Sequence, residues 1–207
     1  MIILILRPEE VVLFFNGGKD CTVALHVLHA YLQHHHPEAR KNLKVAYIRE
    51  EAPFPEMQEF ISDTTKRYNL KLRVLSGPLR SGLETLLSED PQIKAGVMGT
   101  RFGDPYSESQ TEFQPTDSGW PPLMRVNPLL RWSYGEVWEY LRSLSVHYCS
   151  LYDRGYSSIG CVARTLRNPK LLQTLPDGRT EYRPAYELTD FHEERAGRIG
   201  CKSGENS

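Results

Sequence analysis

Short apolar runs alternate with stretches of helical periodicity along the N-terminal part of the chain. Residues 11–15 (VVLFF) are β-branched, aromatic or aliphatic, which is typical of a buried strand. Residues 21–33 place leucines at spacings of three and four, which indicates one apolar helix face. The alternation continues and predicts strands over residues 44–48, 71–75, 95–99 and 126–130, with helices from Pro55, over 79–88 and from the Ser133–Glu136 capping box.

This alternation predicts an α/β fold, with an open, mostly parallel twisted sheet and helices on both faces. Ligands of such sheets bind beyond the carboxyl ends of the strands. We therefore expect the loops that follow Phe15, Ile48 and Gly99 to converge on one site. We expect residues 1–207 to form a single domain, with a core over 11–145, an irregular tail over 146–198 that wraps the core, and a disordered end over 199–207.

Composition narrows the functional classes. The chain has 207 residues, 40% hydrophobic and 25% charged, as a folded globular protein does. The formal charge of -1 argues against a strongly basic surface for nucleic acid, and no apolar run approaches the ~18–20 residues of a membrane helix. The four cysteines form no CxxC pair and no signal-peptide pattern is present, which indicates a reducing compartment. We expect a cytoplasmic monomer or weak oligomer that binds neither nucleic acid nor membrane, with a mitochondrial or nuclear pool left open.

The segment FNGGKD, residues 15–20, joins the first strand to the start of a helix. Gly17 and Gly18 let the backbone turn tightly and approach a ligand. The N-terminus of the following helix offers unpaired N–H groups that suit a phosphate, and Lys19 adds a point charge. Asp20 repels phosphate unless Mg2+ lies between them. The alternative is a tight turn with a solvated Lys19–Asp20 pair.

A second loop, Gly99-Thr100-Arg101 followed by Asp104, comes directly after the fourth strand. The Arg101 guanidinium suits phosphate oxygens, and the Asp104 carboxylate suits a metal ion. An Asp-Pro turn beside a surface arginine is the alternative. The position at the carboxyl end of a central strand favours the functional interpretation.

A third segment, residues 114–134, carries Trp120 and Trp132 with Asp117 and Arg125 between them. An aromatic ligand stacks on such side chains while polar groups recognise its edges. Two core tryptophans in a proline-bent loop are the alternative.

Near the end of the chain, Arg195 and Arg198 lie three residues apart, so on a helix they share a face. Together with Lys19 and Arg101 they would surround a polyanion, although a solvated basic helix end is the alternative. These segments together suggest a nucleoside triphosphate beside an aromatic co-substrate. If the co-substrate carries its own phosphate, no protein nucleophile is needed, and cations with Mg2+ must offset the repulsion between two anions.

Six motifs in order resemble eukaryotic FAD synthase (FMN adenylyltransferase), a family of the phosphoadenosine-phosphosulfate-reductase-like group. The resemblance extends from Val11 to Arg198. Its motifs are FNGGKD, GTRFGDPY, QPTDSGWP, RVNPLLRWSYGEVWEYL, YCSLYDRGYSSIG and YRPAYEL with ERAGR. The resemblance implies a reaction of MgATP with FMN that gives FAD and pyrophosphate.

The resemblance also implies roles for particular residues. Catalytic roles fall to Asn16, Asp20, Asp104, Arg195 and Arg198. ATP-binding roles fall to Phe15, Gly17, Gly18, Lys19, Ile48, Arg49, Gly99, Thr100 and Arg101, with adenine bound largely through the backbone of Ile48 and Arg49. Flavin-binding roles fall to Asp117, Trp120, Arg125, Trp132, Asp153 and Tyr156. Mg2+ is expected at Asp104 and Asp20.

The sequence departs from the family pattern at residues 161–164, CVAR, where a small residue and then an acidic or amide residue are usual. The family's helix before the first strand is also replaced by MIILILRPEE, so we expect a short isoform or a truncated product. Two other functions remain open. A sulfonucleotide reductase needs a C-terminal cysteine motif that Cys201, in GCKSGEN, does not match. A flavin-binding module with impaired catalysis would bind flavin without releasing pyrophosphate.

Overall fold

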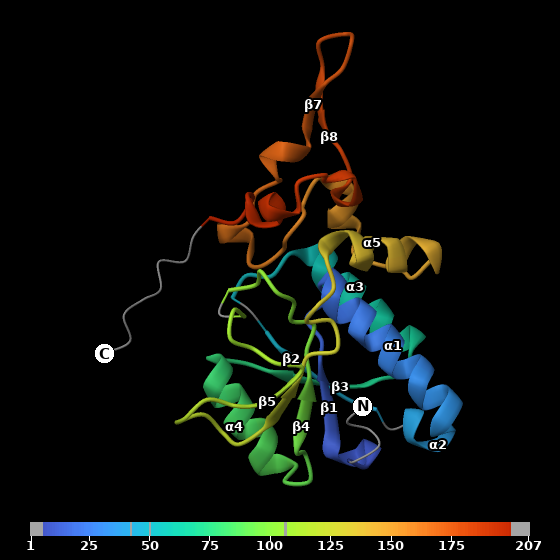
Figure 1. The fold of residues 1–207 in the computed structure, drawn as a ribbon, viewed down its shortest axis with the longest axis vertical. Coiled ribbons are helices and arrows are strands. Elements are labelled where there is room, and N and C mark those ends of the chain that lie inside the picture. Colours follow the sequence, from blue (N-terminus) through green and yellow to red (C-terminus); the bar gives the residue numbers. More distant parts are fainter. Residues whose placement is uncertain (1–5, 42, 50, 106, 200–207) are drawn as a thin grey trace.

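An open sheet of six strands forms the centre of the computed structural model, which describes residues 6–41, 43–49, 51–105 and 107–199 (Figure 1). Its strand order is β3-β2-β1-β4-β6-β5, and every neighbouring pair is parallel except β5 with β6. The predicted mostly parallel sheet is therefore confirmed. The strands are β1 (Val11–Phe14), β2 (Lys44–Ile48), β3 (Lys71–Leu75), β4 (Ala95–Val97), β5 (Phe113–Pro115) and β6 (Met124–Val126).

Helices cover both faces of the sheet, as the alternating pattern predicts (Figure 1). Successive β1 side chains point to opposite faces, so Leu13 packs in the large apolar cluster and Val12 in the smaller one. The larger cluster includes side chains of α1 (Lys19–His35), α3 (Pro55–Arg67) and α5 (Tyr134–Ser143), whereas α4 (Leu79–Glu89) packs in the smaller. The short helix α2 (Pro37–Arg40) follows α1 directly.

The capping box predicted before α5 is confirmed. The Ser133 N–H donates to Glu136 Oε2 at 2.6 Å, and the Glu136 N–H donates to Ser133 Oγ at 3.2 Å. This reciprocal pair satisfies two backbone donors that the first turn leaves without helical partners. The start of α5 is therefore fixed by its own local sequence.

The predicted strand over residues 126–130 is wrong, because β6 ends at Val126. Pro128 has no N–H for a ladder, and the Leu130 N–H donates to the Asn127 carbonyl at 3.2 Å in a turn. Leu130 is buried in this turn rather than in a strand. An apolar run in the sequence indicates burial here, but not a strand. Phe113–Pro115 form a further strand, β5, which the sequence pattern did not predict and which pairs antiparallel with β6.

The part of the chain after α5 consists of short 3-10 helices and one small hairpin. Its apolar side chains, such as Leu151, Leu171 and Leu188, belong to the same cluster as α1 and α3, so this tail packs on the core. The single domain and its bounds stay a prediction. The elements are η3 (Ser150–Arg154), η4 (Val162–Arg164), η5 (Pro169–Leu171), β7 (Leu172–Thr174), β8 (Thr180–Tyr182), η6 (Ala185–Glu187) and η7 (Phe191–Arg195), while η2 (Pro8–Glu10) precedes β1.

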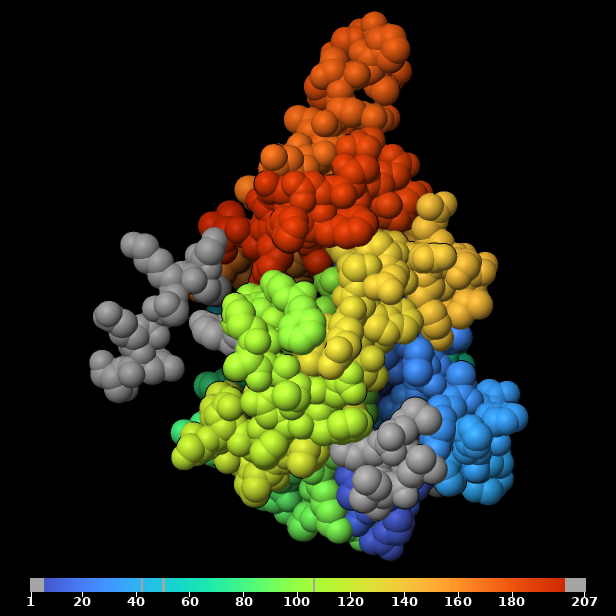
Figure 2. All heavy atoms as spheres, in the orientation of Figure 1, coloured from blue at the N-terminus to red at the C-terminus, as the bar shows by residue number. Residues whose placement is uncertain are grey.

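The β7–β8 hairpin projects from the rest of the molecule, as Figure 2 shows. The disordered end expected over residues 199–207 lies, apart from Ile199, outside the described residues. None of the described helices is long and apolar enough to cross a membrane.

Candidate active site

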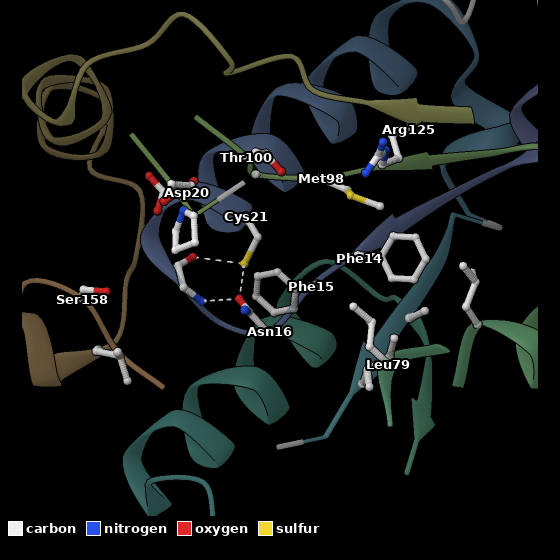
Figure 3. A pocket seen from close by; sticks show the side chains of 18 of the residues that line it. Phe14, Phe15, Asn16, Asp20, Cys21, Leu79, Met98, Thr100, Arg125 and Ser158 are labelled. Atoms are coloured by element: carbon white, nitrogen blue, oxygen red, sulfur yellow. Dashed lines mark hydrogen bonds between the residues drawn. The ribbon is translucent and has the colours of Figure 1, made fainter. Parts of the chain in front are cut away.

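A cavity of about 1200 Å³ lies at the carboxyl ends of the central strands (Figure 3). Phe15 after β1, Ile48 at the end of β2 and Gly99 after β4 all line it, so the predicted convergence of these three loops is confirmed. Pockets for one small ligand commonly enclose roughly 300–1,000 Å³. This cavity exceeds that range.

The loop after β1 turns tightly at Gly17, whose φ of 80° lies in the left-handed region. A Cβ there would lie 2.9 Å from Ile61 Cγ1 of α3, so the position also requires close packing. Gly18 then caps α1, and its N–H donates to Asn16 Oδ1 at 3.0 Å. The first turn of α1 lies against the cavity through Lys19, Asp20 and Cys21.

The loop after β4 packs directly on this first turn. A Cβ at Gly99 would lie 2.6 Å from Cys21 N and 2.8 Å from the Asp20 carbonyl carbon. Both neighbours are backbone atoms that cannot move aside. The missing side chain at Gly99 therefore brings Arg101 to the N-terminus of α1.

Two cations and two carboxylates form a largely buried ion cluster, and three of these residues, Lys19, Asp20 and Glu194, line the cavity. Arg101 Nε donates to Asp20 Oδ1 at 2.7 Å, and Arg101 Nη2 donates to Glu194 Oε2 at 2.5 Å. The Lys19 ammonium lies 3.1 Å from Asp20 Oδ2 and also donates to Glu194 Oε1. Each cation therefore contacts both carboxylates, although Glu194 comes from η7 at the far end of the chain.

Burial and the neighbouring carboxylates shift the pKa values of these two cations in opposite directions. Burial alone would lower the pKa of Lys19, but the carboxylates of Asp20 and Glu194 hold it above its ordinary value. The same balance raises the pKa of Arg101. Lys19 and Arg101 are only 2% and 4% exposed, so both charges are already paired inside the protein. Their direct contact with phosphate stays a prediction.

Asp104 and the tail arginines lie at the rim of the same cavity. The Arg101 N–H donates to Asp104 Oδ2 at 2.9 Å, and Arg195 Nη1 lies 4.0 Å from Asp104 Oδ1. Burial, reinforced by the nearby charge of Asp20, raises the pKa of Asp104. Arg198 packs over Gly160, where a Cβ would lie 2.6 Å from the guanidinium carbon. The predicted shared helical face is not formed, because η7 ends at Arg195.

Of the six residues predicted to bind flavin, three line the cavity: Asp117, Trp120 and Arg125. Arg125 Nη2 donates to Asp117 Oδ1 at 3.1 Å, and its buried Nε has no hydrogen-bond partner among the described residues. Trp120 is 38% exposed beside this pair. An aromatic surface next to an incompletely bonded guanidinium suits a planar ligand with polar edges.

The other three lie outside the cavity lining. The Trp132 ring packs edge-on against Tyr140 with ring centroids 5.6 Å apart. The Asp153 carboxylate accepts a hydrogen bond from the Tyr148 hydroxyl at 3.0 Å, on an exposed surface. Tyr156 packs against Phe54. Their direct contact with flavin stays a prediction that this geometry does not support.

The residues predicted to bind adenine, Ile48 and Arg49, line another wall of the cavity. The Arg49 N–H already donates to the Leu75 carbonyl at 2.8 Å, which extends the sheet by one residue. The Thr100 and Met98 side chains also line the cavity (Figure 3). Apolar side chains in this lining, such as Ile48 and Met98, suit a nucleobase.

Sequence reasoning missed some of the lining residues. Phe14, Leu79 and Met98 supply apolar surface (Figure 3). Tyr152 accepts a hydrogen bond from the Lys19 N–H at 2.9 Å, and Glu194 bridges the two buried cations. Glu194 begins the ERAGR motif, but the motif alone assigns it no role.

The sequence matches known proteins over most of its length. Residues 10–83 and 78–167 match the Phosphoadenosine phosphosulfate reductase domain family. The chain is 40% identical over 196 residues to a probable FAD synthase of Schizosaccharomyces pombe, covering 93% of this chain and 72% of that protein. The chain belongs to the FAD synthase family. A probable FAD synthase of Caenorhabditis elegans is 42% identical over 191 residues, which cover 92% of this chain and 37% of that protein.

Solved structures of the family have the same fold. Candida glabrata FMN adenylyltransferase, in complex with FMN and the ATP analog AMPCPP, superimposes with a TM-score of 0.89 at 28% identity. That match covers 95% of this chain and 84% of the other. The phosphoadenylyl-sulfate reductase of Candida auris shares the fold alone, with a TM-score of 0.55 at 18% identity. The chain spans 37% of the length of the Caenorhabditis elegans relative.

Proposed function

We propose that the chain is an FMN adenylyltransferase, which transfers AMP from ATP to the phosphate of FMN and releases pyrophosphate. One observation carries this proposal. A single cavity is lined both by apolar and aromatic side chains, such as Phe14, Leu79 and Trp120, and by the FNGGKD loop, Asp104 and the tail arginines. Two planar ligands bound against the apolar surfaces would place their phosphates at the charged groups.

The reaction needs no nucleophile from the protein. An oxygen of the FMN phosphate, already ionised near neutral pH, forms a bond to the α-phosphorus of ATP. The bond from that phosphorus to the oxygen bridging to the β-phosphate breaks, and pyrophosphate leaves with the electron pair. The protein therefore has to position two anions in line and offset their repulsion.

The chain's own residues supply positioning and charge. The N-terminus of α1 offers backbone N–H groups at Asp20 and Cys21, where the helix dipole favours a phosphate. Arg195 and Arg198 face the same region from the tail and add positive charge. We propose that Trp120 and Arg125 hold the flavin and that the wall beside Ile48 holds the adenine.

Mg2+ would neutralise phosphate charge in this reaction class. Asp104 fits it, since its Oδ1 accepts no hydrogen bond from any described residue. Asp20 fits less well, because its two oxygens already accept from Arg101 and Lys19. No three His, Cys, Asp or Glu side chains in the described part of the chain are arranged to hold a metal alone. This suits Mg2+, which usually takes one or two carboxylates and completes its shell with phosphate oxygens and water.

The test is direct. Purified protein is incubated with FMN, ATP and Mg2+, and FAD and pyrophosphate are measured by chromatography and a coupled assay. Riboflavin is the control, because it lacks the attacking phosphate and should give no product. Asp104→Asn should raise the Mg2+ concentration needed for half-maximal activity. Flavin binding without pyrophosphate release would contradict the proposal and indicate a binding module.

A thiol-blocking reagent separates the proposed reaction from sulfonucleotide reduction. Cys21 and Cys149 are buried free thiols, and burial raises the pKa of Cys21 to about 12, so neither is poised for redox chemistry. FAD formation should survive modification of accessible thiols. We propose the cytoplasm as the compartment, because it keeps such thiols reduced.

A further inference from the structure

The side chain of Glu194 joins the tail to the two loops that form the charged end of the cavity. One oxygen accepts from Lys19 of the first loop, and the other accepts from Arg101 Nη2 of the β4 loop at 2.5 Å. The side chain is only 13% exposed. A carboxylate so enclosed, with one cation on each oxygen, forms strong and specific contacts.

The backbone around Glu194 is fixed as well. The Ser157 hydroxyl donates to the Glu194 carbonyl at 2.6 Å, and Asn168 Nδ2 donates to the Glu193 carbonyl at 2.8 Å. Ser157 and Asn168 are themselves buried and joined by a hydrogen bond of 2.7 Å. Side chain and backbone together hold η7 in one position over the cavity.

The next residue along the chain is Arg195, which lines the cavity 4.0 Å from Asp104. Its own guanidinium is 40% exposed, and that single ion pair is too weak to fix it. We infer that Glu194 is a positioning residue, which anchors the tail to Lys19 and Arg101 and thereby sets Arg195 against the reacting phosphates. This inference rests on the proposed adenylyl transfer.

The need for a carboxylate follows from the charges. Lys19 and Arg101 carry two positive charges, and Asp20 alone offsets one of them. In a Glu194→Gln variant the amide can still accept one hydrogen bond, but its NH2 group meets a cation and is repelled. The tail would then move outward and take Arg195 with it.

The experiment compares Glu194→Gln with Glu193→Gln. Glu193 is the matched control, because it belongs to the same 3-10 helix but its side chain pairs on the surface with Lys170, at 3.5 Å. Glu194→Gln should lower kcat for FAD formation by about 10- to 100-fold, as small misplacements of a catalytic group do. The KM for FMN should change far less. Glu193→Gln should behave as the wild type.

A double variant distinguishes positioning from general damage. If Glu194 acts through Arg195, then adding Glu194→Gln to an Arg195→Ala protein should lower kcat by less than about twofold, relative to Arg195→Ala alone. If the double variant instead lost kcat by the product of the two single-variant losses, the inference would be overturned. Should Glu194→Gln fail to fold, Glu194→Asp serves in the same cycle, since it keeps the charge but is too short to reach both cations.

Amide hydrogen exchange of residues 191–198 gives a readout that does not depend on activity. Glu194→Gln should speed exchange in this segment, whereas Glu193→Gln should not. If amide exchange in residues 191–198 were unchanged in Glu194→Gln, the inference that Glu194 anchors the tail would be overturned, even if the enzyme were active. If the wild type forms no FAD, the proposed function fails, and the exchange comparison alone then decides whether Glu194 anchors the tail.

Discussion

The thiol of Cys21 lies within hydrogen-bond distance of the side-chain amide of Asn16, with Sγ 3.0 Å from Oδ1 (Figure 3). The thiol also lies 3.1 Å from the Gly18 carbonyl, but that oxygen already accepts from the Thr22 N–H at 3.0 Å and the Thr22 hydroxyl at 2.8 Å. With both lone pairs of the carbonyl in use, the S–H donates to Asn16. Asn16 Oδ1 then accepts from two donors, the Gly18 N–H and the Cys21 thiol, and its NH2 group donates to no described residue, so it can face a phosphate.

This relationship predicts that the donor at position 21 matters for catalysis. Cys21→Ala should lower kcat for FAD formation by about fivefold, because one hydrogen bond that orients Asn16 is lost. Cys21→Ser keeps a donor and should retain most of the wild-type rate. The measurement is steady-state FAD synthesis at saturating ATP and FMN.

The control for this series is Cys161→Ala, because Cys161 is half-exposed and does not line the cavity. It should leave kcat unchanged. Equal rates for the alanine and serine variants at position 21 would show that the thiol does not orient Asn16.

The elements that hold Asn16 could be predicted from the sequence, because each leaves a local signal. The apolar run before it marks β1, and paired glycines mark the turn. The ERAGR motif contains Glu194 but does not reveal its role, because its partners Lys19 and Arg101 are distant in the sequence and only the fold brings them together. Trp132 shows the converse. The composition of the segment around it suggested a ligand site, but its ring packs against Tyr140.

Glycine substitutions at two positions should have opposite effects on stability. Gly99→Ala should destabilise the protein by about 1–3 kcal/mol, because its Cβ would overlap the backbone of α1. Gly82→Ala should stabilise it by about 0.5–1 kcal/mol, since that Cβ would lie 3.5 Å from Ile48 Cγ1, an ordinary contact, within α4. Urea unfolding measures both. A Gly99→Ala protein as stable as the wild type would contradict the close approach of β4 to α1.

The stability of the protein is expected to be acid-sensitive at Glu10, the last residue of η2, directly before β1. Its carboxylate accepts from Lys94 Nζ at 2.6 Å and from the Arg7 N–H at 2.9 Å, and these contacts lower the pKa of Glu10 from 4.5 to about 2. A lowered pKa in the folded state stabilises the protein above pH 4.5, and this stabilisation is lost as the pH falls towards 2. The difference in free energy of unfolding between the wild type and Glu10→Gln should therefore shrink over that range.

Urea unfolding at a series of pH values measures this difference. Glu9→Gln is the matched control, because Glu9 is an exposed neighbour whose Oε1 lies 3.6 Å from Arg7 Nε in a surface ion pair. It should follow the wild type throughout. A difference for Glu10→Gln that stays constant with pH would show that these contacts do not favour the ionised carboxylate.

The buried ion cluster predicts a large loss of stability when one of its cations is removed. Arg101→Ala leaves Asp20 and Glu194 buried with only Lys19 between them, and breaking such a cluster costs about 3–5 kcal/mol. Arg131→Ala is the control, because Arg131 is 78% exposed in its pair with Glu112, and its loss should change stability by less than about 0.5 kcal/mol. Urea unfolding near neutral pH compares the two variants. Similar small losses in both would mean that the two carboxylates find water when Arg101 is gone, and that η7 is held by its backbone contacts instead.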